Sequence, residues 1–414
     1  MNMESTQTGL KSSPRFSIQS VINLLFVMIV FIVTRQVPFS FLSPLMNLAV
    51  ISIITLSVYK NKPDRYSTLL IFFLLLIPLG GSLLYSIVVT DNNAVLAIKF
   101  FLVLVSVGLA CFVHVDRGAL KWFVRLCLLQ AFIMLAIFLY LVVFMNMKSY
   151  LPIRFFFLER GWGDVYTYNG YFYRIQIKGS ALMLIAFVLN LELKLFKRQY
   201  LVAAFLLLGV ILAGNFAFLI SLFIYFVYKI FSLRKIKSAD AYLLRLLCIG
   251  VVSVFVMPFI YQYALSVIEL KKDTSLGTRG DQFNELMKNL GENPFTILLG
   301  QGLGNTLDVK TTFRDYTGDT YFEIQILYVF NQLGVLFSCL FIAYNFLLTL
   351  KLWGRGSFIL YFIYFIYITY AITNPYILDT NHVVMIIVLN SMYVILKKSN
   401  EYQQDRLGYR PLPA

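Results

Sequence analysis

Long apolar runs separated by short polar segments extend along nearly the whole chain. A helix that crosses a bilayer needs about 20 consecutive apolar residues, and most of the runs reach or approach that length. The pattern therefore predicts an all-α polytopic integral membrane protein with about 12 transmembrane helices. The predicted spans are Phe16–Thr34, Phe39–Tyr59, Ser67–Val89, Ala94–Val115, Trp122–Met145, Gly179–Leu195, Tyr200–Ala213, Phe216–Ile230, Ala241–Leu265, Ile324–Leu348, Ser357–Thr373 and His382–Leu396.

The run from Tyr200 to Ile230 is almost unbroken and would be about 46 Å long as a single helix. That length is too great for one span and short for two, and Gly214-Asn215 is the one plausible turn within it. With two spans there, 22 of the 35 Lys and Arg residues but 7 of the 20 Asp and Glu residues fall on the cytoplasmic side. That side then carries the whole net charge of +15, as the positive-inside rule requires. We therefore predict two short spans and cytoplasmic termini.

Composition supports the same class. The 414 residues are 59% hydrophobic and 13% charged, which is more apolar surface than a soluble core absorbs. The excess of basic residues is explained by topology, so we expect no nucleic-acid partner and take the lipid bilayer as the surroundings. All four cysteines fall within predicted spans, and no residues have the spacing of metal ligands. We expect no disulfide framework, no metal and no other cofactor.

Two enlarged outer loops interrupt the apolar pattern. The first, residues 146–178, is rich in aromatic side chains and in cations. Aromatic residues beside a membrane usually form an interfacial belt. They also stack on sugar rings, and arginine binds phosphate through paired hydrogen bonds. The loop is therefore either an interfacial belt or a site for a lipid-phosphate-linked glycan, and its candidate contacts are Arg154, Arg160, Arg174 and Lys178.

The second outer loop, residues 266–322, is the longest polar segment of the chain. Its apolar residues recur at helical spacing, which predicts an amphipathic helix over residues 279–290. The residues of that apolar face are Phe283, Leu286, Met287 and Leu290. Arg279 then lies in the first turn, where free backbone N–H groups favour an anion. We therefore take Arg279 as the leading candidate for binding a phosphate.

A glycine trio follows that helix. Gly300, Gly302 and Gly304 form either a flexible turn or a backbone that approaches an anion closely. The trio does not open a nucleotide-binding helix, so a Rossmann site is excluded. Arg314, in the same loop, is a further candidate contact for the substrate.

Three titratable residues stand near the outer ends of predicted spans. Glu323 precedes the tenth span and is either a charge favoured by the helix dipole or a catalytic base. His382 begins the last span and is a second candidate proton carrier. Lys99 lies near the outer end of the fourth span, where it either reaches back to the interface or contacts a substrate phosphate.

These residues resemble the bacterial O-antigen polymerase and ligase superfamily. The resemblance rests on Arg279 followed by a helix and Gly300-Gln-Gly-Leu-Gly304, and on Glu323 followed after ten residues by Gly334. Arg174, followed by Gly179 and an apolar run, is similar to a second arginine of the family. Where the family has Ser-Arg-Gly before the eighth span, this chain has Gly214-Asn215-Phe216. Ligases of the superfamily have His-Asn at the position that matches Glu323, and neither outer loop here contains His, which favours a polymerase.

The resemblance implies a metal-independent membrane glycosyltransferase of the bacterial inner membrane. Its substrate is an oligosaccharide repeat unit linked to undecaprenyl pyrophosphate, and the growing glycan passes from its carrier to the non-reducing end of a new unit. Arg279 and Arg174 would hold the pyrophosphate, and Glu323 would deprotonate the acceptor hydroxyl. A chain-length regulator and a flippase are the further partners implied. The alternatives are an O-antigen ligase, a flippase or other transporter of the lipid-linked unit, and, less favoured, a structural scaffold.

Overall fold

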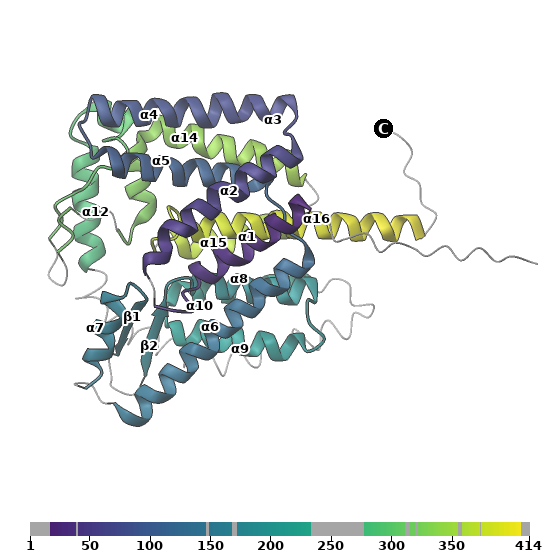
Figure 1. The fold of residues 1–414 in the computed structure, drawn as a ribbon. Helices are drawn as coiled ribbons and strands as arrows, with labels where there is room; N and C mark the ends of the chain where they lie inside the picture. Colours follow the sequence, from purple (N-terminus) through teal and green to yellow (C-terminus); the bar gives the residue numbers. More distant parts are fainter. Residues whose placement is uncertain are drawn as a thin grey trace, which may run out of the picture.

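The computed structural model describes residues 17–38, 40–145, 149–167, 172–232, 277–310, 315–318, 322–354, 358–372 and 374–406. Within these ranges the chain is mostly helical, and apolar helices form the bulk of the molecule (Figure 1). Six helices are long and apolar enough to cross a membrane, and five further apolar helices are shorter. The protein is therefore helical with several candidate membrane spans, as the apolar pattern predicts.

The predicted segments and the observed helices agree closely. The longer helices are α2 (Ser43–Asn61), the continuous run of α3 (Arg65–Leu70), η2 (Ile71–Leu76) and α4 (Ile77–Val88), then α5 (Ala94–Leu109) with η3 (Ala110–Phe112), α6 (Arg117–Phe144), α14 (Gln325–Trp353) and α16 (Thr380–Arg406). The shorter ones are α1 (Ile18–Val33), α8 (Ala181–Leu193), α9 (Gln199–Ala213), α10 (Phe216–Ser232) and α15 (Phe358–Ala371), and η1 (Ser40–Leu42) precedes α2. The predicted span Ala241–Leu265 lies outside the described residues.

The turn predicted at Gly214-Asn215 is present. Helix α9 ends at Ala213, Gly214 has a φ of +61°, and α10 begins at Phe216. A positive φ is accessible to glycine at little cost, which explains why the chain turns at this residue. The Asn215 side chain accepts a hydrogen bond from the Ala217 backbone N–H at 3.0 Å and so caps α10.

The helix bundle has two distinct ends. One end, called here the hairpin end, carries a short helix α7 (Leu151–Glu159), a β-hairpin and helix α12 (Gly277–Leu290). In Figure 1, α12 lies crosswise beside the ends of α4, α5 and α14.

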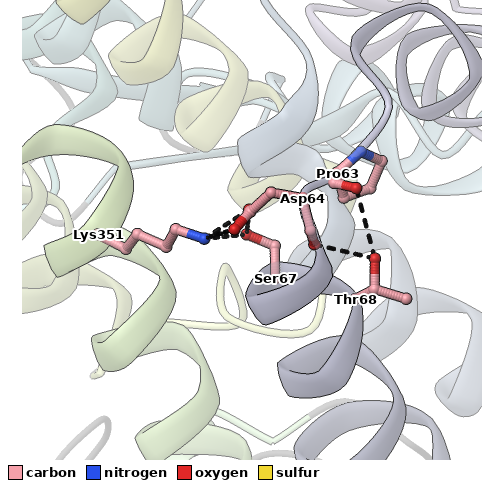
Figure 2. A network of polar contacts seen from close by, with 5 residues as sticks. All are labelled: Pro63, Asp64, Ser67, Thr68 and Lys351. Atoms are coloured by element: carbon pink, nitrogen blue, oxygen red, sulfur yellow. Dashed lines mark hydrogen bonds and ion pairs between the residues drawn. The ribbon is translucent and has the colours of Figure 1, made fainter.

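At the opposite end of the bundle, an ion pair joins Lys351, near the end of α14, to Asp64, which precedes α3 (Figure 2). The hydrogen bonds from Lys351 and then Ser67 lower the pKa of Asp64 to about 2, so the carboxylate is charged at neutral pH.

The hairpin corrects the all-α expectation. Strands β1 (Gly163–Thr167) and β2 (Tyr173–Ile177) pair antiparallel within the first of the predicted outer loops. The apolar residues Val165, Tyr173, Ile175 and Ile177 are buried at alternating positions, and Arg174 on β2 is buried as well. This two-residue period is the signal of a half-buried strand. The sequence analysis does not predict it, because the aromatic residues of the loop indicate either an interfacial belt or a glycan site and hide the alternation of apolar residues.

A kink in α14 receives the glycine loop. Gly334 has a φ of +63° and a ψ of −178° inside the helix, so the axis breaks there. The backbone of Gly300, which follows α13 (Pro294–Leu299), packs directly against this break. A Cβ added at Gly334 would lie 2.3 Å from the Gly300 nitrogen and 2.5 Å from the Leu298 oxygen. Only glycine fits both the conformation and the contact.

Replacement of Gly334 by alanine should therefore disrupt the fold at this point. The backbone conformation alone costs about 1–3 kcal/mol for a residue with a Cβ, and the contact with Gly300 adds to it. We expect a large fall in the midpoint of thermal unfolding and in membrane levels of the full chain. Gly80→Ala is the matched control because Gly80 lies within α4 with no atom within 4 Å of a new Cβ. That control should be neutral or stabilise the protein by about 0.5–1 kcal/mol. Equal unfolding midpoints in the two variants would contradict the assignment.

Candidate functional site

The structure brings Arg279 and Glu323 together. Arg279 lies in the first turn of α12, as predicted, and Glu323 lies two residues before α14. The Arg279 Nε donates to the Glu323 Oε2 at 2.8 Å, with 30% and 26% of the two side chains exposed. Gln282, one turn along α12, is fully buried and accepts a hydrogen bond from the Glu323 backbone N–H at 3.0 Å. The pair therefore sits at the junction of two helices, half-buried and within reach of solvent.

Polar side chains hold α12 on the first part of α14. Asn331 is buried on α14 and donates to the Asn289 Oδ1 on α12 at 2.7 Å. Asn305 donates to the side-chain oxygens of both Asn289 and Asn331, at 3.3 Å and 3.2 Å. Tyr328 donates to the Asn305 carbonyl at 2.8 Å. Buried hydrogen bonds of this kind fix one arrangement, because any shift leaves polar atoms unpaired.

The apolar face of α12 differs from the prediction. Leu286 is buried beside Thr278 and Gln282. In contrast, Phe283 is 49% exposed and Met287 is 44% exposed. The helix is therefore held mainly by its polar side, and part of its apolar stripe is at the surface. Periodicity identified the helix correctly but did not identify the face that packs against α14.

The sequence predicts either a flexible turn or a close approach to an anion for the glycine trio. In the structure, the backbone of the trio contacts other parts of the protein. Gly300, Gly302 and Gly304 all have positive φ angles. Their backbone N–H groups donate to Thr296 O at 2.9 Å, Gln332 O at 3.1 Å and the Gln332 Oε1 at 3.3 Å, respectively. The Asn92 side chain donates to the carbonyl of Gln301 at 2.9 Å, which ties the loop to the start of α5. In this conformation the glycine N–H groups are occupied, so we assign the three glycines to packing and not to substrate binding.

The loop between α15 and α16, residues 374–379, links several parts of the site. The Gln325 Oε1, at the start of α14, accepts hydrogen bonds from the backbone N–H groups of Ile377 and Leu378 at 2.6 Å and 3.1 Å. The Asn215 side chain donates to Asn374 at 2.9 Å. The hydroxyl of Tyr367 donates to the Tyr376 carbonyl at 2.6 Å. The loop is anchored from α14, from α15 and from the turn between α9 and α10, and it joins the region of Glu323 to the Gly214 turn.

Arg174 lies at that turn. It is buried, with 6% of its surface exposed, and it stands on β2 opposite Tyr166 in the register of the hairpin. Its guanidinium carbon is 5.6 Å from the centre of the Tyr166 ring. A Cβ added at Gly214 would lie 2.6 Å from the Arg174 Cγ. The glycine in this turn therefore leaves the space that the arginine side chain occupies.

A second group of charges includes Asp379, the last residue of the loop 374–379. The field of Asp379 acts on both Arg35 and Lys178, and Lys99 is close enough to act on Lys178. Loss of hydration, followed by the nearby cations, lowers the pKa of Lys178, whereas loss of hydration raises the pKa of Asp379. Lys178 and Lys99 were predicted contacts. Arg35 and Asp379 were missed, although each is a charged residue in a short polar segment between apolar runs.

His382 has a structural position. Its side chain is 3% exposed and stacks near Tyr364 and Tyr367, with ring centres 5.8 Å and 5.4 Å away. The Nδ1 is 3.0 Å from the Ile377 carbonyl, which only accepts, so the proton is assigned to Nδ1. The Nε2 then accepts from the Tyr364 hydroxyl at 3.0 Å. Both ring nitrogens are occupied by protein groups, so the predicted proton transfer by His382 is not supported.

The other predicted substrate contacts, Arg154, Arg160 and Arg314, add little to the description of the site. Arg154 forms an ion pair with Asp164 at 2.8 Å, which raises the pKa of the arginine and ties α7 to β1. Arg160 is exposed at the end of α7, with its guanidinium carbon 5.9 Å from the centre of the Phe156 ring. Arg314 lies outside the described residues. Among the residues that are described, no group of three or more His, Cys, Asp or Glu side chains is placed to hold a metal ion, and metal independence stays a prediction.

The structure thus brings Arg279 and Glu323 into contact and places Arg174 and Lys178 on or next to strand β2. The glycine trio and His382 have structural roles. No protein-family model matches the sequence, and no curated protein matches it. What the fold establishes is a mostly helical protein with several candidate membrane spans.

Proposed function

We propose that this protein is a membrane glycosyltransferase that polymerises lipid-linked oligosaccharide repeat units. The observation that carries the proposal is the half-buried Arg279–Glu323 ion pair at the junction of α12 and α14. Arg279 relieves the free-energy cost of holding the Glu323 carboxylate there, and both side chains remain within reach of a substrate in solvent. A cation and a base at one end of an apolar bundle suit a substrate whose lipid lies in the membrane and whose sugars lie outside it.

In the proposed reaction, a hydroxyl oxygen at the non-reducing end of a new repeat unit attacks the anomeric carbon of the growing glycan. The bond between that carbon and the diphosphate oxygen breaks, and the lipid diphosphate leaves with the electron pair. Glu323 accepts the hydroxyl proton, and Arg279 stabilises the charge that the leaving diphosphate gains. Because the two side chains are in contact, the arginine also orients the carboxylate.

Arg174 supports this reaction from the hairpin. Its charge is buried at the Gly214 turn, and Asn215 connects that turn to the loop 374–379. A buried cation contributes a positive potential that water screens only weakly. We assign Arg174 to positioning this loop and to the positive field of the site.

The test is reconstitution of the purified full-length protein with undecaprenyl-pyrophosphate-linked repeat units. We expect a ladder of products that differ by one repeat unit. Transfer of glycan to a lipid A acceptor in place of a ladder would indicate a ligase. Movement of the lipid-linked unit from one leaflet of the vesicle membrane to the other, without any polymer product, would indicate a flippase. Either of these two results would reject the polymerase proposal.

The proposal requires the hairpin end to face the periplasm. We expect a cysteine placed at Glu159 or Lys310, two exposed positions at that end, to react with an impermeant thiol reagent in intact spheroplasts. A cysteine at Lys62, an exposed position between α2 and α3 at the opposite end, should react only after the membrane is opened. The native cysteines are replaced by alanine in all variants. Protection of both hairpin-end positions would overturn the topology.

A further inference from the structure

Helix α12 has three sides with different surroundings. Successive residues are about 100° apart around a helix, so positions three or four apart share a side. The first side, which includes Gln282 and Leu286, is buried. The second side, which includes Phe283 and Met287, is apolar and exposed. The third side is polar and exposed, and its residues are Asp281, Asn284, Glu285 and Lys288. A helix whose exposed surface is divided into an apolar and a polar side is typical of the surface of a membrane.

The short helix α13 adds further exposed apolar side chains. Thr296 is buried and donates to the Leu290 carbonyl at 2.8 Å, so α13 is fixed on the end of α12. On either side of Thr296, three apolar side chains are exposed, and 71% of Phe295 is accessible. The exposed apolar residues of the two helices, called here the apolar group, are Phe283, Met287, Phe295, Ile297 and Leu298.

The polar turn between α4 and α5 marks the level of a membrane boundary. It joins two candidate spans, Arg65–Val88 and Ala94–Phe112. A turn between two spans lies outside the hydrocarbon core, because its backbone groups need polar partners. The loop that follows α13 packs on this turn, since a Cβ added at Gly302 would lie 2.8 Å from the Asn92 Nδ2 and from the Thr90 Oγ1. The end of α13 therefore lies near this boundary.

The length of α14 gives the same level independently. Its 29 residues would be about 43 Å long as a straight helix, whereas the hydrocarbon core is about 30 Å thick. The part beyond the break at Gly334, from Val335 to Trp353, is about 28 Å long and matches that thickness. Leu298 lies at the break, since a Cβ added at Gly334 would be 2.5 Å from its oxygen. Helix α13 is therefore at the edge of the core.

An exposed apolar stripe continues from this level along α14. The stripe has helical spacing, and its residues are Val335, Cys339, Ile342 and Phe346. Another side of the helix packs inward, where Tyr344 donates to the Gly108 carbonyl at 3.0 Å. Exposed apolar side chains along a membrane span face lipid. Because Leu298 lies at the start of this stripe, the lipid-facing surface of α14 extends onto α13.

We propose that the apolar group is a membrane-contact surface that rests in the bilayer leaflet at the hairpin end. Helix α12 then lies in the plane of the membrane, in agreement with its crosswise orientation beside the ends of α4, α5 and α14 (Figure 1). Its apolar side faces acyl chains and its polar side faces water. Arg279 is four residues before Phe283 on the same side of the helix, so the Arg279–Glu323 pair lies at the level of the lipid headgroups. This inference depends on the bundle spanning the membrane and not on the proposed reaction.

The test measures the surroundings of nitroxide spin labels on the full-length protein in vesicles of phosphatidylethanolamine and phosphatidylglycerol. Phe283→Cys and Phe295→Cys carry the label, and the native cysteines are replaced by alanine. Oxygen concentrates among acyl chains, whereas a charged nickel chelate stays in water. We expect the collision rate with oxygen, relative to that with nickel, to be several-fold higher at both positions than at Glu285→Cys, the matched control on the polar side of α12. Phe346→Cys, within the stripe of α14, should give a higher ratio still.

Other occupants of this surface give different results. Equal ratios at Phe283→Cys, Phe295→Cys and Glu285→Cys would place the apolar group in water and overturn the inference. Few collisions with either reagent would show that protein covers the group, which would also overturn it. In that case, spin–spin broadening that disappears on dilution with unlabelled protein would identify a second copy of the chain. Without such broadening, the cover is another segment of the same chain.

A second measurement uses the unsubstituted protein and so excludes any effect of the cysteines on the fold. The vesicles contain a phospholipid with a photoactivatable diazirine in its acyl chain, and mass spectrometry identifies the cross-linked residues. We expect cross-links at Phe283, Met287 and Phe295 but not at Asn284 or Glu285, and the reverse pattern would contradict the inference. Neither measurement requires glycan synthesis. Failure of this inference is therefore distinguishable from the absence of a product ladder.

Discussion

Glu323→Gln is expected to reduce the turnover of polymerisation by about 10²–10⁴-fold, because a general base contributes an acceleration of that size. Glutamine has nearly the shape of glutamate and keeps the backbone hydrogen bond to Gln282. It removes the negative charge that pairs with Arg279. The arginine then loses its ion pair with Glu323, so affinity for the diphosphate donor should be unchanged or higher. We expect kcat to fall while KM stays the same or decreases, measured as product bands per unit time over a range of donor concentrations.

Glu285→Gln is the control for this change. Glu285 is an exposed residue of α12, with a weak side-chain pairing to Lys288 at 3.9 Å, and its replacement should leave kcat unchanged. Glu323→Asp should recover part of the activity, since a carboxylate is retained. Normal polymerisation by Glu323→Gln at normal membrane levels would show that Glu323 is only a charge near the start of α14. The proton would then pass to another group or to the substrate itself.

Arg279→Lys is expected to lower kcat/KM by about 10–100-fold, although the positive charge is retained. A hydrogen bond to a charged group contributes about 1.5–3 kcal/mol, and each 1.4 kcal/mol corresponds to about tenfold in rate. The planar guanidinium contacts Glu323 through its Nε and has further N–H groups in the same plane. A lysine ammonium reproduces the charge but not this geometry. The carboxylate therefore loses its orientation, and the leaving diphosphate loses a fixed partner.

Arg125→Lys is the matched control, because Arg125 is an exposed residue of α6 that lies against Trp122, away from the hairpin end. It should polymerise normally. Arg279→Gln should be impaired more strongly than Arg279→Lys, since it removes the charge as well. If Arg279→Lys retains full kcat/KM, the planar arrangement of the guanidinium N–H groups has no role, and Arg279 serves only to neutralise Glu323.

The sequence predicted the helical elements well because each apolar run reports locally on the environment that it needs. Eleven predicted spans correspond to the six longer and five shorter apolar helices of the structure. The turn at Gly214 was predicted from span length, and a positive φ is present there. The hairpin 163–177 was missed, since its alternating apolar residues were hidden among aromatic residues that suggested an interface.

The candidate site was only partly predictable. Helix α12 and the position of Arg279 in its first turn followed from periodicity. The contact between Arg279 and Glu323 did not, because 44 residues separate them along the chain. Gly334 was noted in the sequence as part of a motif, but its conformation and its contact with Gly300 depend on how α13 docks on α14.

The sequence by itself determined the helical class, the positions of the apolar spans and the identity of the charged residues between them. These features can be read locally, because they depend on the apolar content of each segment and on the spacing of its apolar residues. Only the tertiary structure decided which charges meet. It placed Arg35 beside Lys178 through Trp162 and Gly179. It also enclosed His382 between tyrosines. Such contacts join residues far apart in the chain, and their free energy depends on burial and distance, which no local pattern records.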